Sequence, residues 1–242
     1  LVMLLCLSAV YGVIGFIDDY IKVILKRNLG LTAKQKFLLQ LVAAVGFVCW
    51  AVYGMDIATV VKIPFTSIEL DFGIWFIPFA ALVIIATVNS VNLTDGLDGL
   101  ATCVTCMVAL FFILFADKVG NKAVALFASI LLGSLVGFLM YNKFPAKVFM
   151  GDTGSLFLGG AVCGMAIVTE QPLALLIVGL VYVIESLSVI LQVISFKTTG
   201  KRIFKMSPIH HHFEMCGWSE TKIVITFTIV TAVLCLLMLN FG

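Results

Sequence analysis

The chain has 242 residues, of which 62% are hydrophobic and only 12% are charged. Soluble domains carry about 25% charged residues, so this composition excludes a soluble globular protein and indicates a membrane protein. The formal net charge of +2 gives no sign of a nucleic-acid partner, and none is expected.

Apolar runs near 20 residues are long enough to cross the roughly 30 Å hydrocarbon core of a bilayer. Eight such runs follow one another, at about 1–17, 37–54, 74–91, 99–116, 123–141, 155–170, 173–195 and 223–241. We therefore predict an all-α polytopic membrane protein with eight transmembrane helices in a single domain over residues 1–242. Because the chain opens on Leu1, inside an apolar run and without Met, we expect an incomplete N-terminus.

The connections between the predicted spans differ in character. Residues 55–73 alternate apolar and polar side chains around Pro64 and could form a short hairpin. The four strongly polar breaks are residues 18–22, 92–99, 142–155 and 197–222. Since successive spans cross the bilayer in opposite directions, all four breaks are expected on the same face.

Lysine and arginine indicate which face that is. Twelve of them lie on the face of the polar breaks and three lie on the opposite face. The twelve are Lys22, Lys26, Arg27, Lys34, Lys36, Lys143, Lys147, Lys197, Lys201, Arg202, Lys205 and Lys222, and the three are Lys62, Lys118 and Lys122. By the positive-inside rule, the polar breaks are predicted to be cytoplasmic.

Asp18 and Asp19 close the first predicted span, and Lys22 follows one helical turn later. An ordinary membrane-interface ending, with Lys22 reaching toward water, is the simpler interpretation. Adjacent carboxylates at a helix C-terminus, however, meet the negative end of the helix dipole, which is unfavourable. A metal or a cluster of cations is expected to compensate, which favours a functional role.

Asp95 and Asp98 are three residues apart and alternate with glycines at the start of the fourth predicted span. Either carboxylate could cap that helix. Capping does not explain why Asn92 and both acids gather in one glycine-containing turn. An open backbone at Gly96 and Gly99 would suit the close approach of a ligand.

Asp152 stands between Gly151 and Gly154 just before the sixth predicted span. The free N–H groups at a helix start attract phosphate. Asp152 could simply cap the helix. Alternatively it binds Mg²⁺, which typically takes one or two carboxylates together with substrate phosphate oxygens and water.

The three histidines of the chain, His210, His211 and His212, are consecutive. Ser207 and Pro208 before them predict an N-cap and the first residue of a short helix. A solvated polar loop is the alternative to a functional role. Imidazoles beside a pyrophosphate could donate hydrogen bonds or a proton.

Glu185 lies inside the seventh predicted span, where a carboxylate is expensive and usually faces protein or water. We interpret it as a structural group that bonds across helices, with a functional role as the alternative. A secondary transporter would carry acids near mid-membrane and an internal repeat. Only Glu185 has that position and no repeat is found, so this class is disfavoured.

Taken together, the motifs resemble those of the polyprenyl-phosphate N-acetylhexosamine-1-phosphate transferases. The first three motifs are shared across that superfamily, and the histidine segment is similar to its muramyl-pentapeptide branch. The four motifs are Asp18-Asp19-Tyr20-x-Lys22, Asn92-Leu93-Thr94-Asp95-Gly96-Leu97-Asp98-Gly99, Asn142 through Ser155, and Ser207-Pro208-Ile209-His210-His211-His212-Phe213-Glu214.

The resemblance implies a ten-helix enzyme of the bacterial plasma membrane, usually a homodimer, with Mg²⁺ and a cytoplasmic active site. The eight spans would be its third to tenth helices. The implied reaction transfers phospho-MurNAc-pentapeptide from UDP-MurNAc-pentapeptide to undecaprenyl phosphate, giving lipid I and UMP for peptidoglycan. The alternative is the sister branch acting on UDP-GlcNAc, whose members carry an Arg-containing segment in place of residues 210–214.

The resemblance also implies roles for individual residues. Asp152 would bind Mg²⁺, and Asp18 or Asp19 would orient or deprotonate the lipid phosphate. Lys22 and Lys34 would bind phosphate, and the three histidines would face the pyrophosphate and sugar. The nucleotide side of the cleft would be lined by Asn92, Asp95, Asp98, Asn142, Phe149, Gly151 and Gln192. Direct attack by the lipid phosphate is favoured, and a covalent aspartyl-phosphate route remains open.

Overall fold

The computed structural model describes residues 1–26 and 29–241; Arg27, one of the twelve cations counted above, lies outside them. In this part of the chain, eight helices are long and apolar enough to cross a membrane, which confirms the predicted all-α polytopic fold. They are α1 (Val2–Val23), α2 (Ala33–Gly54), α3 (Phe76–Thr94), α4 (Leu100–Lys118), α5 (Lys122–Asn142), α6 (Gly151–Val168), α8 (Leu180–Thr199) and α10 (Glu220–Phe241). The short helices are η1 (Gly73–Trp75), η2 (Pro172–Ala174), α7 (Leu175–Val178) and α9 (Ile209–Met215).

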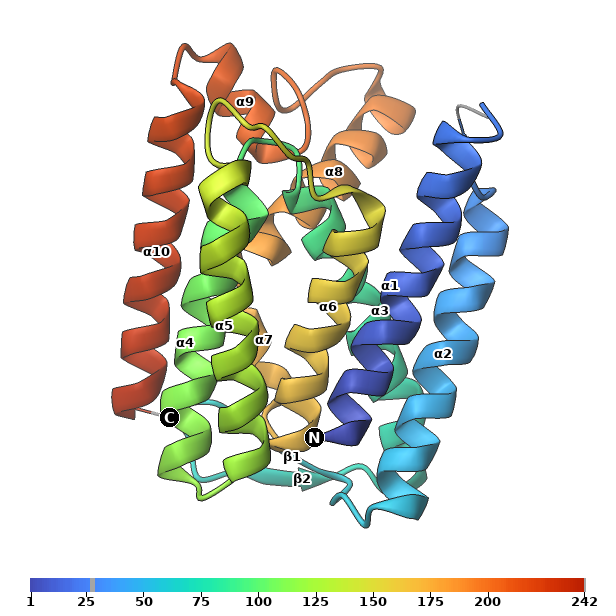
Figure 1. The fold of residues 1–242 in the computed structure, drawn as a ribbon, viewed down its shortest axis with the longest axis vertical. Helices are drawn as coiled ribbons and strands as arrows, with labels where there is room; N and C mark the ends of the chain where they lie inside the picture. The colour runs from blue at the N-terminus through green and yellow to red at the C-terminus, as the bar shows by residue number, and fades with distance from the viewer. Residues whose placement is uncertain (27–28, 242) are drawn as a thin grey trace.

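The predicted hairpin is confirmed. Strands β1 (Val60–Lys62) and β2 (Glu69–Asp71) pair antiparallel, with Val61 opposite Leu70. The hairpin, the start of α1 and the end of α10 lie at one end of the helical bundle, and the four polar breaks lie at the other end, near α9 (Figure 1).

Several helices extend beyond the apolar runs that predicted them, and two of these extensions carry site residues. Helix α1 continues to Val23, so Asp18, Asp19 and Lys22 are helical rather than part of a loop. Helix α6 begins at Gly151, so Asp152 belongs to its first turn. Hydropathy indicates only the apolar part of a helix. The helical hydrogen bonding of the backbone can continue through the polar residues that follow.

The seventh predicted span, 173–195, is not one helix. Pro172 opens η2, and Gly179, with φ −101° and ψ 19°, separates α7 from α8. The apolar run is unbroken in the sequence, so hydropathy alone could not reveal the interruption.

Helix α6 lies at the centre of the bundle and is largely buried, with α1 and α3 packed against it (Figure 1). Glycine permits this close packing. A Cβ atom at Gly15 of α1 would lie 2.5 Å from the carbonyl carbon of Asp152, and one at Gly159 of α6 would lie 2.5 Å from Cα of Val88. The polar end of α1 is thereby brought directly against the first turn of α6.

Candidate active site

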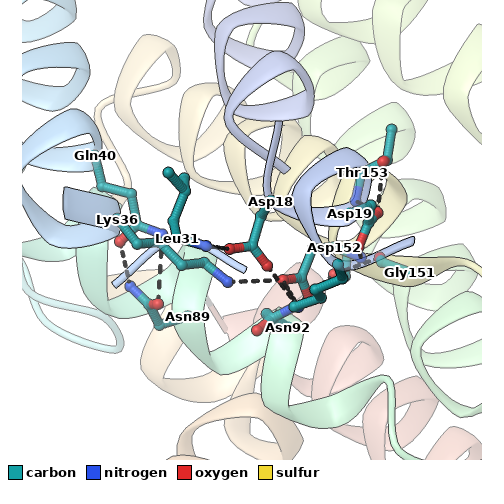
Figure 2. A network of polar contacts seen from close by, with 12 residues as sticks. Asp18, Asp19, Leu31, Lys36, Gln40, Asn89, Asn92, Gly151, Asp152 and Thr153 are labelled. Carbon is teal, nitrogen blue, oxygen red and sulfur yellow. Dashed lines mark hydrogen bonds and ion pairs between the residues drawn. The ribbon is translucent and has the colours of Figure 1, made fainter. Parts of the chain in front are cut away.

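Three carboxylates from two helices converge at the polar end of the bundle. Asp18, Asp19 and Asp152 each offer one oxygen, and these oxygens lie within 4.8 Å of one another. Figure 2 shows Asp18 and Asp19 reaching from α1 toward Asp152 on α6. The predicted convergence of these residues is therefore found in the structure.

The two adjacent aspartates have different partners because consecutive side chains on a helix point about 100° apart. Asp19 accepts hydrogen bonds from the backbone N–H and the hydroxyl of Thr153, at 2.8 and 2.6 Å. It thus satisfies N–H groups that the start of α6 leaves without intrahelical partners. Asp18 is buried, accepts the backbone N–H of Leu31 at 2.8 Å and pairs with Lys22 at 2.5 Å.

Asp152 is surrounded by donors. The ammonium groups of Lys22 and Lys36 lie 2.8 and 2.9 Å from its Oδ2 atom. The amide of Asn92 donates to its Oδ1 atom at 2.7 Å. The site therefore holds three acidic and two basic side chains in contact, which leaves an excess of negative charge.

Lys36 is the contact that sequence reasoning missed. Lys34, which was predicted to bind phosphate, is exposed, whereas Lys36 is part-buried against Asp152. A capping box between Thr32 and Gln35 fixes the residue at which α2 begins. It therefore determines which side chains of α2 point toward Asp152. Lys36 then shares a face with Gln40 one turn later, and this polar i, i+4 pair was the available signal.

Gln40 continues the polar network into the bundle. It accepts a hydrogen bond from the amide of Asn89 at 2.7 Å, and Asn89 lies one turn before Asn92 on α3 (Figure 2). Neither Gln40 nor Asn89 was predicted. The two residues connect α2 to α3 about one helical turn from Lys36 and Asn92.

Asp95 and Asp98, in the α3–α4 turn, have different environments. The pKa of Asp95 is raised from 3.8 to about 7, because burial removes its carboxyl group from water and Asp152, Asp19 and Asp98 add negative charge nearby. Asp98 accepts the backbone N–H of Ala146 at 2.8 Å and so fixes the loop between α5 and α6.

Asn142 and Gln192 were predicted to line the nucleotide pocket, but their amide groups are engaged by protein. Asn142 accepts from the hydroxyl of Thr102 at 2.7 Å and donates to the carbonyl of Val148 at 3.0 Å. Gln192 accepts two backbone N–H groups, those of Ile203 and Phe204, both at 3.0 Å. Both residues shape the loops around the site.

Phe149 and Gly151 flank the start of α6. The Phe149 ring is 76% exposed and is free to stack on a planar ligand. Gly151 has φ +65°, and a Cβ atom there would lie 2.9 Å from Oδ2 of Asp19. Glycine is thus required both for the backbone conformation and for the approach of Asp19.

The three histidines lie in distinct surroundings. The structure differs from the prediction that all three face the substrate, because His210 is fully buried and contacts Glu185. His211 pairs with Glu214, and His212 accepts the backbone N–H of Lys205 at 3.1 Å. Helix α9 has Pro208 as its N-cap, one residue later than predicted.

The chemistry of the carboxylate cluster fits Mg²⁺. Three carboxylates offer the hard oxygen ligands that this ion prefers. Two ammonium groups on one oxygen of Asp152 indicate that the cluster attracts positive charge. Asp152 would hold the ion, with Asp18 and Asp19 within reach.

Comparison with known proteins gives a consistent family assignment. The model of the family described as "Glycosyl transferase family 4" matches residues 1–170. A phospho-N-acetylmuramoyl-pentapeptide-transferase of Clostridium botulinum (strain Eklund 17B / Type B) is 52% identical over 94% of this chain and 69% of its own length. Relatives with the same name, from Halalkalibacterium halodurans and Clostridium perfringens (strain 13 / Type A), are 50% and 53% identical over 93% of this chain and 69% and 70% of their own lengths.

These matches confirm the resemblance found in the four motifs. The family model covers residues 1–170, and the matches to the named relatives extend over 93–94% of the chain. The chain belongs to the phospho-N-acetylmuramoyl-pentapeptide-transferase family, within glycosyl transferase family 4.

Proposed function

We propose that this chain transfers phospho-MurNAc-pentapeptide from UDP-MurNAc-pentapeptide to undecaprenyl phosphate, forming lipid I and UMP. The observation that carries the proposal is the identity of 50–53% to relatives whose name specifies transfer of the phospho-N-acetylmuramoyl-pentapeptide group. The charged cluster at the polar end supports it, because joining two phosphate-bearing substrates requires positive charge where they meet.

The transfer exchanges one phosphorus–oxygen bond for another. An oxygen of the lipid phosphate attacks the β-phosphorus, which carries MurNAc, and a new P–O bond forms. The bond from that phosphorus to the bridging oxygen breaks, and UMP leaves with the electron pair. A phosphate monoester is already partly dianionic at pH 7, so the attacking oxygen does not require a strong base.

Lys22 and Lys36 supply the positive charge. Their ammonium groups contact Oδ2 of Asp152, and they can turn to phosphate oxygens that enter the cluster. Lys22 is held by Asp18 as well, so Asp18 orients a phosphate-binding cation. Placing two reactants in line is worth several kcal/mol of the barrier, roughly 7–11 in favourable model systems.

The existing hydrogen bonds favour the one-step route. Asp19 already accepts donors from Thr153, and Asp18 already binds Lys22 and the Leu31 N–H. A nucleophilic aspartate on the covalent route would first have to give up such partners. These contacts suit positioning roles for both aspartates.

Mg²⁺ is part of the proposal. Held by Asp152 with Asp18 and Asp19 nearby, the ion would neutralise and orient the pyrophosphate of the nucleotide substrate. Its binding is testable without turnover, by the loss of the free Mn²⁺ signal in electron paramagnetic resonance when the protein is added. Mn²⁺ that stays free at protein concentrations well above ~0.1 mM would contradict the assignment.

We infer that the enzyme lies in the bacterial plasma membrane with its charged cluster facing the cytoplasm. The excess of lysine and arginine at the polar end supports this orientation. Eight apolar helices support a multi-pass membrane location. A homodimer is proposed on the family resemblance alone, and light scattering of the detergent-solubilised protein tests it.

The function is tested by UMP release from the purified protein in detergent with undecaprenyl phosphate and Mg²⁺. UDP-MurNAc-pentapeptide and UDP-GlcNAc are offered separately. Release with the muramyl substrate alone is the expected result. Release with UDP-GlcNAc alone would move the chain to the sister branch, and release with neither would contradict the transferase proposal.

A further inference from the structure

A buried acid–imidazole pair connects α8 to α9. Glu185 on α8 and His210 at the start of α9 are both 0% exposed, and Oε2 of Glu185 lies 2.9 Å from Nδ1 of His210. A carboxylate inside a membrane-spanning helix is costly unless it is paired. The sequence-based interpretation of Glu185 as a group that bonds across segments therefore has a definite partner.

The pair leaves two polar atoms unsatisfied. In the described part of the chain, Oε1 of Glu185 and Nε2 of His210 are the buried side-chain atoms that lack a hydrogen-bond partner. Unsatisfied buried polar groups are rare, and their cost must be offset by what the arrangement achieves.

The other edge of the imidazole meets the α3–α4 turn. A Cβ atom at Gly96 would lie 2.6 Å from Cε1 of His210 and would overlap Nε2. The open side of Gly96, which the sequence suggested for a ligand, is therefore filled by His210. The turn that carries Asp95 and Asp98 rests directly on this ring.

The helix that carries Glu185 is itself fixed to its neighbours. The hydroxyl of Ser186 donates to that of Ser90 on α3 at 2.7 Å. Tyr182 and Thr105 on α4 share a hydrogen bond of 2.8 Å. Glu185 thus presents its carboxylate from a rigid position between α3 and α4.

We propose that Glu185 and His210 are a positioning pair: Glu185 holds the hydrogen on Nδ1 of His210, and the fixed ring supports the Asp95–Gly99 turn and anchors α9. The anchored helix α9, which carries His211 and His212, lies at the polar end of the bundle (Figure 1). His210 then acts without touching substrate. This inference rests on the proposed transferase function for its kinetic test.

The first experiment compares Glu185→Gln with Glu185→Leu, and uses Glu69→Gln, an exposed acid on β2, as the matched control. Gln keeps an oxygen that can accept from Nδ1, whereas Leu does not. We expect Glu185→Leu to lower kcat for UMP release at least tenfold with a smaller change in KM. Glu185→Gln should retain at least one third of the wild-type kcat, and the control all of it.

Two kinetic outcomes would overturn the proposal. Wild-type kcat in Glu185→Leu would show that the pair does not position the site. Equal, severe loss in both variants would show that the charge of Glu185, and not its hydrogen bond, is required.

A second measurement is independent of activity. The chain has three histidines, so ¹⁵N-histidine NMR of the wild-type protein shows the signals of three imidazoles. The signals that are missing from the spectrum of His210→Gln belong to His210. We expect the His210 hydrogen to be fixed on Nδ1. A His210 ring that exchanges between tautomers, like free imidazole, would overturn the inference. If instead the wild-type protein releases no UMP, the proposed function fails while this spectrum still decides the pairing.

Discussion

Lys36 on α2 and Asp152 on α6 form an ion pair, with Nζ 2.9 Å from Oδ2, although 116 positions separate them in the sequence. Lys22 binds the same oxygen at 2.8 Å. Two ammonium groups thus meet at one carboxylate oxygen of the acidic cluster. An entering phosphate can therefore take over these cations without a large movement of the helices.

The first prediction concerns Lys36. Lys36→Met should lower kcat/KM for UMP release at least tenfold, because one of the two ammonium groups at the site is lost. Loss of a charged donor that is needed in the transition state typically costs about 10²–10³ in rate. Lys26→Met, at an exposed position in the same region, is the control.

Lys34→Met decides between the two lysines of α2. The structure shows Lys34 exposed, so its replacement should cost less than that of Lys36. If Lys34→Met abolishes activity while Lys36→Met leaves it intact, the role predicted from the family motif holds and our assignment of Lys36 is wrong.

The second prediction concerns Asp152. Asp152→Asn should reduce kcat by about 10³ or more, since it removes the charge that pairs with the two lysines and that we propose binds Mg²⁺. Mn²⁺ binding should weaken in parallel. Asp117→Asn, an exposed acid in the last turn of α4, should change neither property. Normal turnover of Asp152→Asn at ordinary Mg²⁺ concentrations would rule out the metal assignment.

The sequence predicted the fold and the central cluster because both depend on strong signals. Eight apolar runs gave the spans, and alternation of the spans brought Asp18, Asp19 and Asp152 to the same end. The break at Gly179 was missed, because the apolar run continues through the residue at which α7 ends and α8 begins.

The neighbours of each site residue could not be predicted in the same way. Lys36 and Lys34 are both basic and two positions apart, and only the start of α2 decides which one faces the cluster. The three histidines are likewise identical and consecutive, so the sequence does not indicate which of them is buried. His210 is buried because Glu185, 25 positions earlier, lies beside it in three dimensions.

The third prediction concerns Phe149. Its ring is 76% exposed beside the start of α6, where it is available to stack on the uracil ring. Stacking of a base on an aromatic side chain is worth about 1–3 kcal/mol. Phe149→Ala should therefore raise the KM for the UDP substrate about tenfold, with a smaller effect on kcat. An unchanged KM would remove Phe149 from the nucleotide site.

The fourth prediction concerns the pH dependence of stability. The carboxyl group of Asp95 has a pKa of about 7 in the folded protein and 3.8 ordinarily. As the pH rises from 4 to 7, the unfolded chain loses this proton before the folded one, so the folded state loses stability over that window. Asp95→Asn removes this dependence.

We therefore expect Asp95→Asn to raise Tm relative to wild type at pH 8, by on the order of 5 °C, and by less at pH 5. The comparison is made in EDTA, because a bound cation would offset the negative charge of Asp152 and Asp19. A Tm difference that is the same at both pH values would contradict the raised pKa of Asp95.

The last prediction concerns Gly15, which sets the distance between α1 and α6. A Cβ atom there would lie 2.5 Å from the carbonyl carbon of Asp152 and 2.7 Å from the nitrogen of Thr153. Both are backbone atoms, so the clash cannot be relieved by rotating a side chain. Gly15→Ala should force α1 away from α6 and weaken the bonds from Thr153 to Asp19.

Overpacking of this kind costs about 1–3 kcal/mol, so we expect a lower Tm, weaker Mn²⁺ binding and slower UMP release. Gly133→Ala on α5, where nothing lies within 4 Å of the added atom, is the matched control and should leave all three unchanged or raise Tm slightly. A Gly15→Ala protein that binds Mn²⁺ and releases UMP like the wild type would mean that the cluster tolerates separation of α1 from α6. The close approach of these two helices would then be a matter of packing alone.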